Sequence, residues 1–168
     1  PGGLYLAATA YKSDDFRPYI YRTEDYGRRW KKVVDGIASD HFTRVVRADD
    51  ERPGLLFAGT EAGLYASFND GEDWIPFQRN LPVSPITDLA VKEGDLIAAT
   101  QGRGYWVLDD ISLLRNLDDD VFEKAAHLFP PRDGWRLQNG SQEAPKHRGQ
   151  NPPAGVVFHY LLGDELPS

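Results

Sequence analysis

Short apolar segments recur along this chain of 168 residues, and their recurrence constrains the fold more than any other feature. Three of them, at residues 3–9, 54–60 and 94–100, align without gaps. Each is too short for a core helix, is entered from a glycine turn and ends in small residues followed by threonine. This pattern is typical of a buried strand. The matched threonines recur at intervals near the ~40–45 residues of a four-stranded repeat unit.

Further strand-like segments flank each of these runs. Alternating segments precede two of them, at 42–47 and 86–91, and a third strand follows each, at 19–22, 63–66 and 104–107. A fourth follows two of them, at 29–34 and 73–77. The sequence therefore predicts an all-β fold, a β-propeller fragment of about three four-stranded antiparallel blades. We expect a partial blade at 1–35 that lacks its first strand, a full blade at 41–79 and a last blade at 84–137.

The end of the last blade is less regular. Asp residues at possible helix caps predict short helices near 111–126, and residues 128–131 and 135–137 are candidates for a returning edge strand. Residues 138–155 are polar and rich in Pro and Gly, which predicts a linker. Residues 156–162 form one more apolar segment. It either begins a following domain, within 156–168, or supplies the strand missing from the first blade.

Composition excludes several classes of protein. The net charge of −7 disfavours a nucleic-acid module, and the absence of Cys excludes disulfides and thiol catalysis. No apolar run is long enough for a membrane-spanning helix. Met is absent too and the chain opens Pro1-Gly2-Gly3, so we interpret it as a piece of a larger protein.

One motif occurs twice, each time between the third and fourth strands. Its pattern is Ser/Thr, any residue, Asp/Asn, any residue, Gly, two further residues and Trp, carried by Thr23, Asp25, Gly27 and Trp30 and again by Ser67, Asn69, Gly71 and Trp74. In such a turn the Asp or Asn accepts from backbone N–H groups, the Gly permits a positive φ and the Trp folds under as an apolar plug. A degenerate third copy keeps only Asp110.

This motif resembles the Asp-box, or BNR repeat, of sialidases, sortilin-type receptors and related bacterial propellers. The stretch 54–117 looks like the C-terminal blades of large exported bacterial proteins with sortilin-like propellers, which are often labelled glycosyl hydrolases. The resemblance implies an extracytoplasmic location, periplasmic or secreted, and a β-sandwich module after the propeller. The Asp-box is a folding motif, so the resemblance is specific for fold rather than for activity.

The topology of a propeller predicts where ligands bind. Turns opposite the Asp-boxes line one face, and their binding candidates are Arg17, Tyr19, His41, Gln101 and Arg103. A glycosidase needs two carboxylates about 5–9.5 Å apart, for which the candidates are Glu61 with Asp14, Asp15 or Asp40. We expect no metal and no cofactor, since the four His residues are scattered.

We therefore expect a scaffold with a ligand-binding surface for carbohydrate or peptide, without complete catalytic machinery. The alternatives are a glycoside hydrolase of the BNR type and a sortilin-like peptide-binding module. The expected partners are the rest of the parent propeller or a second copy, through open strand edges, with no nucleic acid and no membrane span. Whether the chain is an enzyme stays open.

Overall fold

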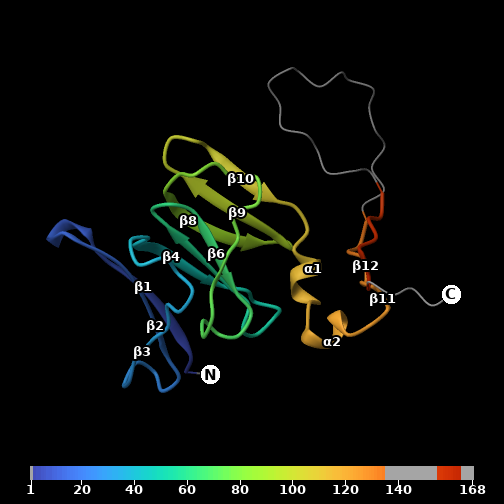
Figure 1. Ribbon diagram of the computed structural model, residues 1–168, viewed down its shortest axis with the longest axis horizontal. Helices are drawn as coiled ribbons and strands as arrows, with labels where there is room; N and C mark the ends of the chain where they lie inside the picture. Colours follow the sequence, from blue (N-terminus) through green and yellow to red (C-terminus); the bar gives the residue numbers. More distant parts are fainter. Residues whose placement is uncertain (1, 135–154, 164–168) are drawn as a thin grey trace. The chain divides into compact units, whose positions relative to one another are not determined.

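The computed structural model describes residues 2–134 and 155–163, and within them the fold is all-β, with antiparallel sheets of two to four strands (Figure 1). The chain divides into two compact units, Pro1–Leu108 and Asp109–Ser168. The all-β prediction is confirmed, and none of the described sheets closes on itself. Each unit is described by itself below.

The first unit contains three sheets that follow one another in chain order. Sheet 1 has the order β1-β2-β3, sheet 2 the order β4-β5-β6-β7 and sheet 3 the order β10-β9-β8. Their bounds are β1 (Leu4–Ala10), β2 (Asp15–Thr23), β3 (Lys31–Lys32), β4 (Thr43–Ala48), β5 (Leu56–Thr60), β6 (Leu64–Ser67), β7 (Ile75–Pro76), β8 (Ile86–Lys92), β9 (Asp95–Thr100) and β10 (Tyr105–Leu108), with a 3₁₀ turn, η1 (Tyr11–Ser13), between β1 and β2.

Sheets 2 and 3 repeat one another almost residue for residue. The hydroxyl of Thr60 donates to the Gly63 carbonyl, and the hydroxyl of Thr100 donates to the Gly104 carbonyl. Both sheets carry a register irregularity near the start of their first strand, between Thr43 and Val45 and between Ile86 and Asp88. The gapless alignment of 54–60 with 94–100 therefore agrees with the strand pairing.

Sheet 1 departs from that alignment by one residue. Leu4 pairs with Thr23, whereas Leu56 pairs with Ser67, so the strand pairing makes Leu4 the counterpart of Leu56 rather than of Leu55. The pairing of β1 with β2 also has a register irregularity of its own, between Ala8 and Ala10, before the turn η1. A shift of one residue exchanges the two faces of a strand. Tyr5 and Ala7 consequently pack against the core shared with sheet 2.

The prediction of a buried strand at 3–9 is wrong for β1. Leu4 is 55% exposed and Leu6 49%, while the corresponding Leu56 and Ala58 are buried. The difference follows from packing: Leu56 and Ala58 belong to the cluster shared with sheet 1, and within the described residues of the first unit no sheet packs against the face of β1 that carries Leu4 and Leu6.

A buried cluster and a close backbone approach hold the three sheets of the first unit together. Between sheets 1 and 2, buried side chains from both form a single core: Ile20, Val33, Ile37, Val46, Leu56, Ala58, Tyr65 and Trp74. Between sheets 2 and 3, Gly59 lies directly under Ile86, so a Cβ at this glycine would lie 2.7 Å from Ile86 Cγ2. Only glycine therefore allows β5 and β8 to approach this closely.

The second unit contains α1 (Ser112–Arg115), α2 (Asp119–Phe122), β11 (Ala126–Leu128) and β12 (Tyr160–Leu162). The predicted short helices are present, and Asp118 caps α2 by accepting from the Val121 N–H. The predicted strand at 156–162 is only three residues long, and β12 pairs with β11 rather than with sheet 1. The other candidate segments, 135–137 and the predicted linker to 154, lie outside the described residues.

Candidate functional site

The two repeated turns have the same hydrogen bonds. Thr23 Oγ1 accepts from the Gly27 N–H at 3.0 Å, and Asp25 Oδ1 accepts from the Arg29 N–H at 2.8 Å. In the second turn Ser67 Oγ accepts from the Gly71 N–H at 2.9 Å, and Asn69 Oδ1 accepts from the Asp73 N–H at 2.9 Å. In both, the hydroxyl also donates to the Asp or Asn oxygen at 3.0 Å.

The glycines of these turns adopt the conformation that the motif requires. Gly27 has φ +83° and Gly71 has φ +85°. The residues before them, Tyr26 and Asp70, also have positive φ values, of 60° and 62°. Two successive residues in the left-handed region are tolerated because the hydroxyl oxygen and the Asp or Asn side-chain oxygen accept hydrogen bonds from backbone N–H groups of the turn.

The tryptophans of the two turns differ. Trp74 is only 2% exposed, and its indole N–H donates to the Val33 carbonyl at 3.1 Å, across the boundary between sheets. Trp30 is 43% exposed, and its indole N–H donates within the turn, to Gly27, at 3.0 Å. Both indoles fold back under their turns, since a Cβ at Gly27 would lie 3.5 Å from Trp30 Cζ2 and one at Gly71 3.4 Å from Trp74 Cζ2. Only Trp74 is buried as a plug, because a plug requires a neighbouring sheet to cover it.

Charge distinguishes the two turns as well. The Arg29 side chain, whose Nε donates to Asp25 Oδ2 at 2.9 Å, together with the backbone N–H of Arg29, lowers the pKa of Asp25 to about 2. In the second turn the corresponding side chain is neutral Asn69, whose amide donates to Asp73. The first turn therefore depends on ionisation in a way that the second does not.

A polar contact joins the second turn to sheet 1. The Tyr5 hydroxyl donates to Asp70 Oδ1, and Arg22 lies 3.3 Å from Asp70 Oδ2. Burial and the neighbouring Asp70 carboxylate both raise the pKa of Tyr5, so Tyr5 remains a neutral donor at physiological pH. These contacts fix the turn of one sheet against the strands of the preceding sheet.

An aromatic and charged cluster lies at the opposite end of the strands, where β1 meets η1 and β5 meets the next turn. Phe42 is its buried centre, with the Tyr11 ring stacked on it at 5.0 Å and Phe16 tilted against it at 6.2 Å. Arg44 lies 5.2 Å from the Phe42 centroid and donates from Nε to Glu61 Oε2 at 2.7 Å. We call these five residues the Phe42 cluster.

Glu61 is the one catalytic candidate that joins this cluster. It forms an ion pair with Arg44, and its N–H donates to the Phe42 carbonyl. Gln101 occupies the matching position in sheet 3, with its N–H donating to the Pro85 carbonyl. The two side chains thus stand at equivalent turns of successive sheets.

Asp15, Arg17 and Tyr19 form a group of their own. Asp15 and Arg17 were expected in a turn before the predicted strand at 19–22, but all three residues lie on β2, because the connection after β1 is only the short turn η1 and Asp14. Arg17 donates to both oxygens of Asp15, at 2.9 and 2.6 Å, and the Tyr19 hydroxyl donates at 2.6 Å. Arg17 and Tyr19 together hold the pKa of Asp15 well below its usual range.

The other candidates are dispersed over the first unit. His41 Nδ1 lies 2.8 Å from the Tyr65 hydroxyl in a partly buried contact. Asp40 is exposed in the adjacent turn, and Asp14 has φ +60° at the end of η1. Arg103 is exposed, and its carbonyl accepts from the Trp106 indole N–H.

Two of the carboxylate candidates form ion pairs, Asp15 with Arg17 and Glu61 with Arg44. Sequence reasoning missed Tyr11, Phe16, Phe42 and Arg44, although the aromatic residues flanking the β1–β2 turn were visible signals.

The part of the chain that the structure describes contains neither a cluster of metal ligands nor a membrane-spanning helix. No group of three or more His, Asp or Glu side chains is placed to hold a metal ion among those residues. Nor does any helix among them combine the length and apolar character needed to cross a bilayer.

Comparison with known proteins adds no assignment. No family model matches the chain, and no curated protein matches it.

Proposed function

We propose that the chain contributes three blades of an Asp-box β-propeller and serves as a scaffold that presents a ligand-binding surface. The observation that carries this proposal is the matched pair of turns, with the same hydroxyl, Asp or Asn and Gly contacts, at the same place in two successive sheets. Identical turns in successive sheets favour a repeat architecture, in which each unit buries its face only by stacking on a neighbour.

The open faces of the sheets support the scaffold role. Leu4 and Leu6 leave an apolar face on sheet 1, and Tyr105 and Val107 leave another on sheet 3, being 81% and 51% exposed. In sheet 2 the corresponding faces are covered on both sides. We propose that further blades of a ring cover these two faces in an extracytoplasmic parent protein.

The Phe42 cluster is the proposed ligand-binding surface. Tyr11 and Phe16 are 39% and 46% exposed beside the Arg44–Glu61 ion pair, so flat aromatic area and hydrogen-bonding groups stand together. Aromatic faces with adjacent polar groups suit the apolar face and hydroxyls of a sugar, or an aromatic side chain of a peptide. The ligand is therefore a carbohydrate or a peptide.

An NMR titration tests the binding role. We expect a panel of neutral oligosaccharides and short peptides to shift the amide signals of Tyr11, Phe16 and Arg44, without cleavage of any glycosidic bond. The double variant Tyr11→Ser/Phe16→Ser should abolish the shifts, while Val83→Ser, an exposed apolar change outside the Phe42 cluster, should leave them intact. Hydrolysis of an oligosaccharide that Glu61→Gln abolishes would replace the scaffold role with the hydrolase alternative.

The scaffold role has a separate test. With its apolar faces open, the chain alone is expected to associate at high concentration in sedimentation velocity, and Leu4→Lys/Leu6→Lys should reduce that association. A strictly monomeric chain at millimolar concentration would contradict the proposal that these faces are covered by further sheets.

A further inference from the structure

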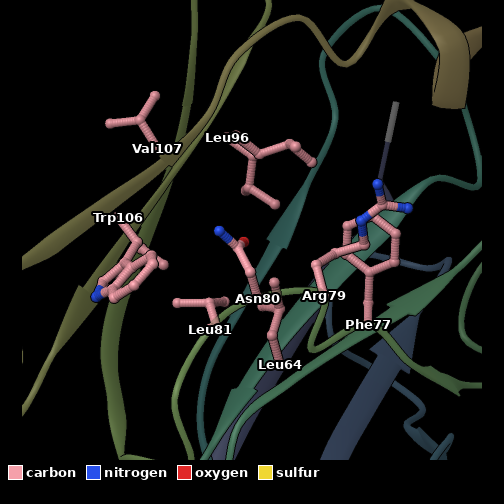
Figure 2. Close-up of a pocket in the computed structure, with 10 residues that line it drawn as sticks. Leu64, Phe77, Arg79, Asn80, Leu81, Leu96, Trp106 and Val107 are labelled. Carbon is pink, nitrogen blue, oxygen red and sulfur yellow. The ribbon is translucent and has the colours of Figure 1, made fainter. Parts of the chain in front are cut away.

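The boundary between sheets 2 and 3 contains an apolar cleft that is partly open to solvent. Its walls come from β6 and the segment after β7 on one side and from β9 and β10 on the other (Figure 2). The lining residues are Leu64, Phe77, Arg79, Asn80, Leu81, Leu96, Ala98, Trp106, Val107 and Leu108. No such cleft was predicted from the sequence.

The repeat explains why this cleft exists. The N–H of Val33 donates to the Ile20 carbonyl and that of Phe77 to the Leu64 carbonyl, so the segments after β3 and β7 correspond. Ile37 and Leu81 also correspond. The N–H of each donates to the carbonyl of the residue three positions before it, Val34 or Gln78.

The strand pairings extend the match to the facing sheet. Leu56 pairs with Ser67 and Leu96 with Leu108, while Ala58 pairs with Tyr65 and Ala98 with Trp106. Six lining residues of the cleft thus have counterparts in the core between sheets 1 and 2: Ile20, Val33, Ile37, Leu56, Ala58 and Tyr65.

One member of that core has no counterpart at the cleft. Trp74 is buried among those residues, and its indole N–H donates to Val33. Leu108 is the counterpart of Ser67, so the position that matches Trp74, seven residues further on, is Arg115, and residues 109–115 include no Trp. The cleft is therefore lined as the site of Trp74 is lined, but the chain has no Trp at the matching position. Phe77 corresponds to Val33, whose carbonyl accepts from the Trp74 indole N–H.

The strand that follows Trp74 has no counterpart either. In sheet 2, Ile75 and Pro76 pair with Ala66 and Tyr65 along the outer edge of β6. In sheet 3, β10 is the outermost strand among the described residues of the first unit. Its residues Trp106 and Val107 leave an edge to which an extended peptide can add.

We propose that this cleft binds the tryptophan side chain of a partner polypeptide whose next residues extend along β10. The occupant is a peptide rather than a free aromatic compound, because the matched site in this chain combines a buried indole with a strand of two residues. The site goes beyond the proposed ligand surface, since the Phe42 cluster uses none of these residues.

The test uses a synthetic peptide with the sequence of residues 67–76, which carries the Trp and the two strand residues in their natural order. We expect saturable binding to the whole chain by isothermal titration, with intermolecular NOEs from the peptide indole to the methyl groups of Leu96 and Leu81. Replacing Trp by Ala in the peptide should weaken binding at least about ten-fold, as for a buried aromatic anchor.

Variants of the chain locate the site. Leu81→Trp fills the cleft with the chain's own indole and should weaken binding at least about ten-fold. Val83→Trp, at an exposed position outside the cleft, should leave affinity unchanged. Equal binding of the Trp and Ala peptides would overturn the proposal, as would NOEs to the exposed Leu4 and Leu6 face. Absence of binding, with NOEs from the cleft to residues beyond Leu108, would overturn it by showing that the chain fills its own cleft.

Discussion

The two Ser/Thr-Asp/Asn-Gly-Trp turns have the same backbone and different tryptophans. Their hydroxyl and carboxyl or amide contacts agree within a few tenths of an ångström, yet Trp30 is 43% exposed and Trp74 only 2%. The turn is therefore a local structure. Hydrogen bonds to its own side chains stabilise it, and it needs no contact with a neighbouring sheet. The burial of the tryptophan depends instead on whether another sheet lies against it.

The comparison also separates local from long-range information in the sequence. The hydrogen bonds of Thr23, Asp25 and Gly27 span four residues, so the motif alone predicts them. The position of Trp74 depends on Val33 in the preceding sheet, 41 residues away. A spacing pattern contains no information about which sheet covers which face.

The largest expected difference concerns the tryptophans. Trp74→Ala should lower the free energy of unfolding by about 3–5 kcal/mol, since it removes a buried side chain and leaves a cavity. Trp30→Ala should cost about 1 kcal/mol or less, as is usual for a partly exposed side chain. Urea unfolding of both variants measures the difference. Equal losses would mean that a further sheet covers Trp30 in solution, for example in a second copy.

The hydroxyls should behave in the opposite way. Thr23→Val and Ser67→Ala each leave turn N–H groups without their acceptor, half-buried at Gly27 and buried at Gly71, so each should cost about 1–3 kcal/mol. Because the two turns have the same bonds, the two losses should agree within about 1 kcal/mol in urea unfolding. A loss confined to Ser67→Ala would show that the first turn depends on its surroundings, against the local account.

The smallest expected effect is a dependence on pH that only the first turn has. The folded pKa of Asp25 is about 2, below the ordinary value of 3.8. Its ionised form thus stabilises the fold above about pH 4, and that contribution is lost as the pH falls towards 2. Asp25→Asn, which copies Asn69, should remove this part of the acid dependence.

Acid unfolding followed by circular dichroism measures the effect. Arg29→Gln is the matched control, because Arg29 is the main cause of the lowered pKa. In this variant the pKa of Asp25 should return towards its ordinary value, so stability at neutral pH should fall and this part of the acid dependence should shrink. Identical acid profiles for the chain and for Asp25→Asn would contradict the assigned role of Asp25.

Much of the fold could be predicted from the residue pattern, and the predictions that were wrong have physical causes. The strands and their antiparallel order follow from short apolar runs between glycine turns. The one-residue shift of β1 could not be predicted, since it follows from the pairing of Leu4 with Thr23, which no composition signal marks. The exposure of Leu4 and Leu6 follows from missing neighbours rather than from their own sequence.

The candidate site was predictable only in part. Glu61 was placed at the correct turn, but its pairing with Arg44 depends on the neighbouring strand β4. Asp15 and Arg17 were placed in a turn because the length of β2 was underestimated. The cleft beside Trp106 could have been anticipated from the repeat. Residues 77–81 correspond to residues 33–37, but no turn that carries a Trp follows β10 within the first unit.

Hydrogen exchange of individual N–H groups by NMR tests the central claim most directly, because it compares backbone and indole protons of both turns in one sample. We predict that the Gly27 and Gly71 amide protons are both protected. We also predict that the Trp74 indole proton exchanges slowly, while the Trp30 indole proton exchanges close to the rate of a solvent-exposed group. An unprotected Gly27 amide, or equally slow exchange of the two indoles, would contradict a self-sufficient turn whose tryptophan is buried only by the neighbouring sheet.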